Sequence, residues 1–578
     1  MNVASTDRMA DISDTTRKRP AWLRWLGPIV LAVLVPTVLV GVRAAMGTGR
    51  QAFEGRLLYW AMPVVLGLWL AVGIWRLRAG RFSWRAFGRA NAAGITMAVL
   101  LAAVVFVVAP PAMRVQFDET SLLGTSQNMH TSRMAVMTTA AIPFDGGVLA
   151  LESTVDKRPP LFPFLVSLVH DVAGYRVSNA FVVNAALLVL LLAIVQGAVR
   201  RRCGALCGFA APLLLVAVPL LGIVAMSAGF ELLAAVLLVV VLLAALDFVA
   251  GPDAPRAAWL LASGLVMAQT RYESVLVFAA LLALVAWRTR GALPLDARCR
   301  WLLGGVPGLL TPLVFLFLNA QRPEFYPEAA GRPLVALQHG ADHAWPFLVA
   351  FFAPGLAHVF PGLAAWLAVA AFAARIVRKR AAIDDLIVLL PVLASLAISL
   401  LWFYGDVREP TALRLFLPIA LLAGLGVIAA KSVLPVRYAG AAILLFAVVF
   451  AGLRVWQLQR ATVFPPLPRT RTIEAIDAAV ANVSHDARST LWVSCEAQHR
   501  IVLGTAAMTP EAFLRRRADL AGLRSRGDLR TIFVVTTPLD AEFAATFGSA
   551  ERLVAQFGGE LVAQAATDAA IRVYRLRM

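Results

Sequence analysis

Two groups of charged residues interrupt a mostly apolar sequence between residues 110 and 175. Asp118 and Glu119 form an adjacent carboxylate pair that follows directly after a long apolar run. The segment D-K-R-P-P at 156–160 is a basic, proline-containing cluster that precedes a shorter apolar run. A carboxylate in such a place can act as a general base toward an acceptor hydroxyl, and the cations can stabilise a leaving phosphate. The two groups therefore suggest chemistry on a charged lipid headgroup at a membrane surface.

Each group also has a simpler interpretation. A carboxylate at a membrane surface is usually only solvated, and basic residues there are attracted to phospholipid phosphates without any catalytic role. Arg271 and Glu273, at a predicted break between two short apolar runs, are more specific, because broken helices at a bilayer edge normally frame a site. Glu231 and Arg414 are predicted at the ends of apolar runs, where a long side chain commonly reaches toward the interface.

The elements that must position these residues are membrane helices. Hydrophobic residues make up 60% of the chain and charged residues only 15%, and the apolar runs have the length needed to cross a bilayer. The long uniform runs exclude both a soluble protein and a barrel of short alternating strands. The net charge of +19 comes largely from arginines between the runs. The positive-inside rule places arginines there, so nucleic-acid binding is not predicted.

We predict an all-α polytopic membrane protein with about 13 transmembrane helices and a small C-terminal α/β soluble domain. Residues 1–24 are predicted to be a cytoplasmic tail, and residues 25–457 a transmembrane domain. The loop 110–175 is predicted to lie outside, after the third span. The arginine distribution predicts a multi-pass membrane protein with the N-terminus in the cytoplasm and the C-terminus outside.

Two segments are predicted in more detail. Within the outer loop, short helices are expected near 122–140 and 160–170, the second of them in the membrane interface. Residues 259–287 are predicted to form two short helices that turn near Arg271. One long helix would instead place that charge in mid-membrane, at a cost of at least a few kcal/mol.

The composition changes after residue 457, and a proline-rich linker opens the segment 458–578, predicted to be an extracytoplasmic α/β domain with its own core. No catalytic constellation is found in it. The pattern predicts strands at 490–494, 500–503, 531–536 and 570–576, and helices at 472–483, 510–523 and 540–557.

No metal site is predicted from the sequence. The four cysteines are scattered, without the spacing of a zinc site. His339 and His343 are one helical turn apart but have no clear third ligand.

The carboxylate pair after an outward-going span, followed by K-R-P-P-L-F-P-F at 157–164, resembles membrane glycosyltransferases of the GT-C superfamily. The closest patterns are those of protein O-mannosyltransferases, aminoarabinose transferases and lipopolysaccharide sugar transferases. Q-T-R-Y-E at 269–273 and R-L-F-L-P at 414–418 are further matches. The resemblance covers residues 90–578. Two extra spans before it, and Phe416 where the family has Tyr, depart from the pattern.

This resemblance implies an inverting glycosyltransferase that moves a sugar from a polyprenyl-phosphate carrier to a lipid, glycan or protein acceptor on the outer face of the inner membrane. Asp118 would be the base, and Glu119 would position the base or the acceptor. The implied substrate-binding residues are Lys157, Arg158, Arg271, Glu273 and Arg414. Several related families need no metal whereas others do, so a divalent metal stays open and no cofactor is assigned.

A transporter or flippase of a lipid-linked or small substrate is the alternative. Such a protein would show repeat symmetry and ionisable residues at mid-membrane, and the sequence shows neither. A scaffold whose C-terminal tail binds a partner is a third class.

Overall fold

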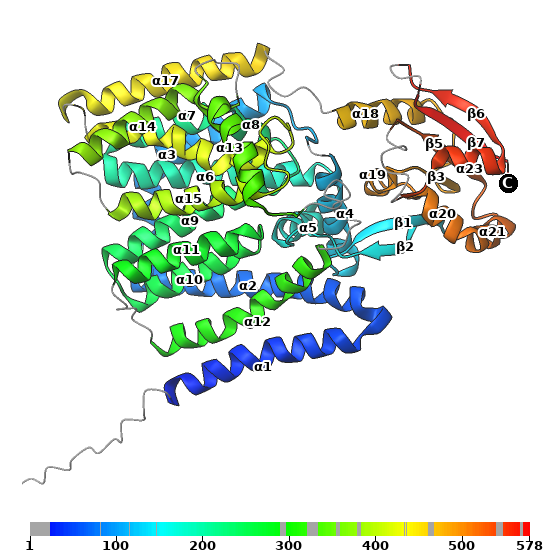
Figure 1. The fold of residues 1–578 in the computed structure, drawn as a ribbon, viewed down its shortest axis with the longest axis horizontal. Coiled ribbons are helices and arrows are strands. Elements are labelled where there is room, and N and C mark those ends of the chain that lie inside the picture. Colours follow the sequence, from blue (N-terminus) through cyan, green and yellow to red (C-terminus); the bar gives the residue numbers. More distant parts are fainter. Residues whose placement is uncertain are drawn as a thin grey trace, which may run out of the picture.

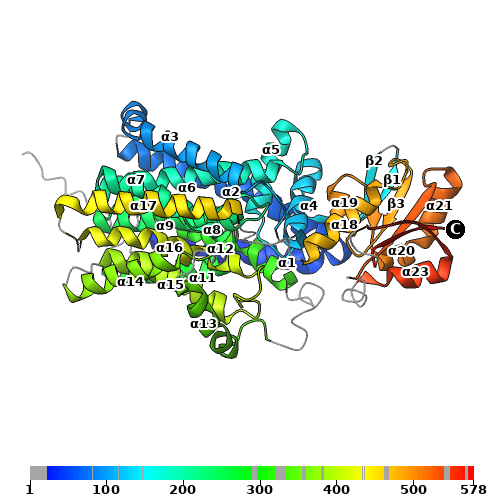
Figure 2. The same cartoon turned by 90° about the horizontal axis from the view of Figure 1, so that it is seen from above.

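A bundle of long helices runs along the molecule, and a small α/β domain sits at one end of it in this computed structural model (Figures 1 and 2). The predicted tail falls almost entirely outside the described residues, and so does most of the proline-rich linker. The structure describes residues 23–577 except 81–82, 115, 146, 290–295, 321–332, 354–358, 379–382, 433, 435, 461–467, 539–546 and 567–569.

The bundle is polytopic, as the apolar runs predicted. Among the described residues, 8 helices are long and apolar enough to cross a membrane, or up to 9 if the bent pair α7–α8 forms one span. Shorter apolar helices lie between them, and the predicted total of about 13 spans stays a prediction. The helices of the bundle are α1 (Leu23–Ala45), α2 (Arg50–Ala79), α3 (Trp84–Val108), α6 (Asn179–Cys203), α7 (Ala205–Val216), α8 (Pro219–Ala225), α9 (Glu231–Ala250), α10 (Ala254–Ala268), α11 (Glu273–Arg288), α12 (Ala297–Ala320), α13 (Leu337–Phe352), α14 (Gly362–Val377), α15 (Ile383–Leu401), α16 (Leu417–Gly426) and α17 (Val436–Arg460), with the 3₁₀ turns η1 (Gly47–Gly49), η4 (Leu413–Phe416) and η5 (Val427–Ser432).

Two breaks in the bundle shape the end that faces the soluble domain. The predicted turn near Arg271 is confirmed, because α10 ends at Ala268 and α11 begins at Glu273. The second break was not predicted: α7 and α8 are bent by 71°. Pro219 opens α8, in the first-turn position where its missing N–H costs nothing. Both breaks bring irregular backbone to the same end of the bundle.

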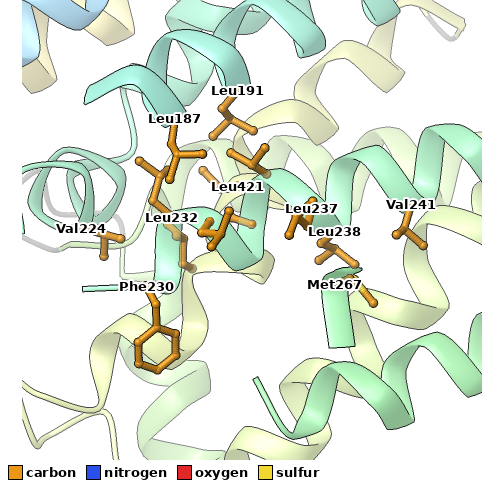
Figure 3. Packing of buried hydrophobic residues seen from close by; sticks show 14 of the residues in the cluster. Leu187, Leu191, Val224, Phe230, Leu232, Leu237, Leu238, Val241, Met267 and Leu421 are labelled. Carbon is orange, nitrogen blue, oxygen red and sulfur yellow. The ribbon is translucent and has the colours of Figure 1, made fainter. Parts of the chain in front are cut away.

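Helix α9 forms the centre of the bundle core (Figure 3). It is apolar on all sides, as expected for a helix surrounded by others, and its buried residues include Leu232 and Leu237. Leu187 of α6, Met267 of α10 and Leu421 of α16 belong to the same buried cluster. This packing fixes the start of α9, where Glu231 lies.

Between the bundle and the soluble domain lie α4 (Gln116–Ser132), α5 (Leu161–Ala173) and an antiparallel hairpin of β1 (Met137–Phe144) and β2 (Gly147–Thr154) (Figure 1). The sequence predicted a helix reaching residue 140, whereas α4 ends at Ser132 and the hairpin follows. Asp145 in the hairpin turn has a φ of 47°, a left-handed value that Asp tolerates better than most residues.

The C-terminal domain contains a five-stranded sheet in the order β4-β3-β5-β7-β6. Strands β3, β4 and β5 are parallel, and β7 pairs antiparallel with β5 and β6. The predicted strand at 500–503 is wrong, because those residues fall largely in a helix, α19. The elements are α18 (Pro468–Ala481), β3 (Thr490–Val493), α19 (Ala497–Val502), β4 (Ala507–Met508), α20 (Pro510–Arg515), α21 (Arg517–Arg526), β5 (Thr531–Thr536), α23 (Ala550–Phe557), β6 (Gly559–Gln564) and β7 (Arg572–Leu576).

The hairpin contributes to the core of this domain although it comes from the loop between two bundle helices. Ala140 and Ile142 of β1 are buried in one cluster with Leu491 and Val493 of β3. Glu152 of β2 forms ion pairs with arginines of the domain. The soluble domain is therefore joined to the bundle by packing as well as by the linker.

Candidate active site

Asp118 lies in the first turn of α4, where a carboxylate is favoured by the helix dipole. Its two oxygens are bound by two different arginines: Arg158 Nη2 donates to Oδ1, and Arg414 Nη2 donates to Oδ2. All three side chains are largely enclosed: the exposed fraction is 17% for Asp118, 6% for Arg158 and 16% for Arg414. The fold thus brings together residues from three distant segments of the chain.

These arginines control the charge of Asp118. Burial by itself raises the pKa of this carboxyl, but the positive charges of Arg158, Arg414 and Lys157 outweigh it, so the pKa lies well below its ordinary value. Asp118 is therefore an ionised carboxylate whose two oxygens are both engaged by guanidinium groups.

Arg158 bridges two carboxylates. Its Nη1 donates to Asp156 Oδ1 over 2.6 Å while its Nη2 binds Asp118. The backbone N–H of Lys157 also donates to Asp156 Oδ1, over 2.7 Å. Asp156 is buried, which raises the pKa of its carboxyl. The backbone carbonyl of Lys157 accepts a hydrogen bond from Tyr272 Oη, which ties this segment to the turn between α10 and α11.

Glu119 is buried beside Asp118 but faces another way. Its carboxylate accepts hydrogen bonds from two backbone N–H groups, that of Arg114 over 2.6 Å and that of Ala228 over 2.8 Å. Ala228 lies in the loop that leads from α8 to α9. This arrangement anchors the start of α4 to the bundle. The Glu119 carboxylate is engaged by these two backbone contacts, so Glu119 positions α4 and is not a second base.

Glu231 joins Arg414 to the turn after α10. Arg414 Nη1 lies 2.9 Å from Glu231 Oε1, and Arg271 Nη1 lies 4.0 Å from the same oxygen. Arg271 Nε also binds Glu273. Four of the six charged residues that bind Asp118 or extend its network were singled out from the sequence as site residues: Arg158, Arg271, Glu273 and Arg414. Glu231 was noted only as a helix-end residue, and Asp156 only as part of the 156–160 cluster.

Two small cavities adjoin this network, and both are lined by Glu231 and Arg414. The first, of about 40 Å³, is also lined by Arg271 and Glu273. The second, of about 30 Å³, is also lined by Arg114, which the sequence did not single out, and by Glu119. Volumes of this size hold no more than a few water molecules. The ion pairs therefore leave little open space around Glu231 and Arg414.

The site's carboxylates do not converge as a metal centre. Over the part of the chain that the structure describes, no three His, Cys, Asp or Glu side chains come together as metal ligands. His339 and His343 each lie 3.0 Å from a backbone carbonyl instead, those of Pro333 and Leu400.

Comparison with known proteins gives no match by sequence: no family model matches the chain, and no curated protein does so either. Solved structures do match. ArnT from Cupriavidus metallidurans bound to undecaprenyl phosphate is 15% identical, with 84% of this chain and 98% of that chain covered and a TM-score of 0.52. The chain has the ArnT fold. The apo state of the same ArnT is 16% identical with a TM-score of 0.51.

The likeness to ArnT extends beyond the bundle, because 84% of 578 residues is more than residues 1–457 contain. The resemblance to GT-C membrane glycosyltransferases drawn from the sequence is confirmed at the level of the fold. Fold does not by itself determine function, so the assignment of an activity depends on the residues around Asp118.

Proposed function

We propose that this chain is an inverting glycosyltransferase that moves a sugar from a polyprenyl-phosphate carrier to a lipid, glycan or protein acceptor on the outer face of the bacterial inner membrane. The observation that carries the proposal is the carboxylate of Asp118 held between Arg158 and Arg414. It supports the proposal because this reaction needs a base and cations for a leaving phosphate at one point. The ArnT with the same fold was solved with undecaprenyl phosphate bound.

In the proposed reaction, the acceptor hydroxyl attacks the anomeric carbon from the face opposite the phosphate. Its proton passes to Asp118, and the bond between the anomeric carbon and the phosphate oxygen breaks. The polyprenyl phosphate leaves with one more negative charge than it had as a diester. Arg414, Arg158 and Arg271 stabilise that charge, Arg414 and Arg158 through guanidinium forks suited to phosphate oxygens.

The contacts with Arg158 and Arg414 also keep Asp118 a weak base until the donor binds. A carboxylate with both oxygens bound to guanidinium groups is a weak proton acceptor. A donor phosphate competes for the same N–H groups, and each guanidinium that turns toward phosphate gives up part of its contact with Asp118. The donor therefore raises the basicity of Asp118 by binding beside it.

Lys157 and Glu273 are proposed to support the donor site and not the proton transfer. Lys157 lies next to Arg158, and its positive charge acts on Asp118. Glu273 binds Arg271 and lines the first cavity with it. The proposed orientation keeps the N-terminus in the cytoplasm and places the site and the soluble domain outside, as the arginine distribution predicts.

Mass spectrometry of envelope glycolipids and glycoproteins tests this function in a strain that lacks the protein. We expect one sugar modification to be lost and to return with the wild-type chain but not with Asp118→Asn. Asp145→Asn is the matched control, because the same change is made on an exposed hairpin turn where Asn accepts a left-handed φ. An unchanged glycan and glycolipid profile in the deletion strain would count against the proposal.

A further inference from the structure

The soluble domain also contacts α4, the helix that carries Asp118. Helix α19 lies against α4 and β1 at the junction of the two parts of the molecule (Figures 1 and 2). Gln498 of α19 stands at the centre of this contact. Its Nε2 donates to Met137 Sδ over 3.1 Å, and its Oε1 accepts from Ser121 Oγ over 3.4 Å. Ser121 follows Asp118 by three residues, which is about one turn of α4.

The packing around Gln498 is close. A Cβ atom added at Gly124 of α4 would lie 3.6 Å from Val502 Cγ2 and 3.7 Å from Gln498 Nε2, in ordinary contact with both. The carbonyl of Val502 accepts a hydrogen bond of 2.7 Å from Tyr175 Oη. Ser121 and Val502 are fully buried. The soluble domain thus seals one side of α4 over its first two turns.

The other sides of α4 are held by the bundle and by α5. Glu119 binds the backbone N–H of Ala228, and Ser126 Oγ lies 3.1 Å from His170 Nε2 of α5. With α19 as a further support, α4 has contacts that fix both its position and its rotation. Rotation decides where Asp118 points, because neighbouring side chains on a helix lie about 100° apart.

We propose that α19, through Gln498, is a positioning element for the reaction, and that the soluble domain is part of the catalytic unit. This inference rests on the proposed function, since it takes Asp118 as the base. A displacement of a reacting group by 1 Å can cost about 100-fold in rate. A helix that is free to rotate on one side therefore loses activity although its catalytic side chain is intact.

Two pairs of full-length variants test the proposal. Gly124→Phe forces α19 away from α4, whereas Gly124→Ala fills existing space and favours the helix. Gln498→Leu removes both hydrogen bonds at similar volume, and Gln556→Leu makes the same change on an exposed face of α23. We expect kcat to fall about 100-fold in Gly124→Phe and about tenfold in Gln498→Leu. The controls should stay within about twofold of wild type.

The pH profile separates positioning from general damage. If α4 turns, Asp118 leaves its arginines and its pKa rises, so the acidic limb of kcat moves to higher pH in Gln498→Leu. A variant that merely folds less well keeps the wild-type profile once activity is divided by the folded fraction measured at each pH. An unshifted profile with a uniform loss would overturn the proposal.

Hydrogen exchange of the α4 amides, residues 116–132, tests the docking without any assay of sugar transfer. We expect faster exchange in Gly124→Phe than in Gly124→Ala. Equal exchange in the two variants would overturn the docking, and faster exchange with full transfer activity would overturn the positioning role. If the wild-type chain transfers no sugar, the proposed function fails, while this comparison still decides whether α19 holds α4.

Discussion

Replacing Asp118 with Asn should move two properties of the protein in opposite directions. Transfer activity should fall, because an amide cannot take the proton of the acceptor hydroxyl. Affinity for polyprenyl phosphate should rise, because Arg158 and Arg414 lose the carboxylate that now engages one guanidinium N–H of each. Replacing a residue that only shapes the pocket would instead reduce both the transfer activity and the affinity for polyprenyl phosphate.

The expected magnitudes of the activity loss and of the affinity gain follow from the contacts of Asp118. A general base contributes about 10²- to 10⁴-fold, which corresponds to about 3–5 kcal/mol of transition-state stabilisation. A hydrogen bond to a charged group is worth about 1.5–3 kcal/mol. Arg158 keeps Asp156 and Arg414 keeps Glu231 as partners in the variant, so only part of that energy becomes available to phosphate. We therefore expect about tenfold tighter binding.

Both quantities can be measured on purified protein in nanodiscs at one fixed salt concentration. Binding of undecaprenyl phosphate is followed by native mass spectrometry, and transfer by release of the carrier phosphate from a lipid-linked sugar. Asp145→Asn serves as the control and should match wild type in both assays. Weaker binding of undecaprenyl phosphate by Asp118→Asn, or transfer at the wild-type rate, would refute the reasoning.

Three further predictions address the surrounding residues. Glu119→Ala leaves two buried backbone N–H groups without their carboxylate acceptor, at about 1–3 kcal/mol each; thermal unfolding in detergent should show a lower midpoint than for Glu119→Gln, and equal midpoints would argue against the anchor. Arg158→Lys cannot bridge two carboxylates as a planar fork does, so steady-state kinetics should show a raised KM for the donor and a reduced kcat, and wild-type constants would contradict the bridging role. Burial lowers the pKa of His170 to about 4, so folding favours the neutral imidazole. The free energy of unfolding should therefore fall by on the order of 3 kcal/mol as the pH drops from about 6.5 toward 4. His170→Gln should flatten this dependence, and a wild-type protein equally stable at pH 7 and pH 5 would disprove the prediction.

The sequence predicted the parts of the site that are local. The Asp-Glu pair, the K-R-P-P cluster and the turn near Arg271 could be found because each is a polar interruption in a long apolar context. The sequence could not show which of the adjacent cations Lys157 and Arg158 would bind Asp118, since neighbouring residues in a loop face different directions. Nor could it join Arg414 to Asp118, because that contact depends on the packing of the whole bundle.

Two errors in the fold have a physical cause as well. Residues 500–503 are a short apolar run, and such a run does not distinguish a strand from one buried turn of helix. The hairpin of β1 and β2 was missed because part of its sequence was assigned to the preceding helix. The burial of β1 comes from the soluble domain, far along the chain, so tertiary packing contributes to its strand conformation.

Transfer by the isolated protein is the most direct measurement of the central claim. The purified chain is reconstituted with a polyprenyl-phosphate sugar and an envelope glycolipid fraction, and both lipids are followed by mass spectrometry. We predict that free polyprenyl phosphate and the glycosylated acceptor form in equal amounts and that Arg414→Ala abolishes both. Movement of the intact lipid-linked sugar across the bilayer, with no covalent change in either lipid, would contradict the account and favour a flippase.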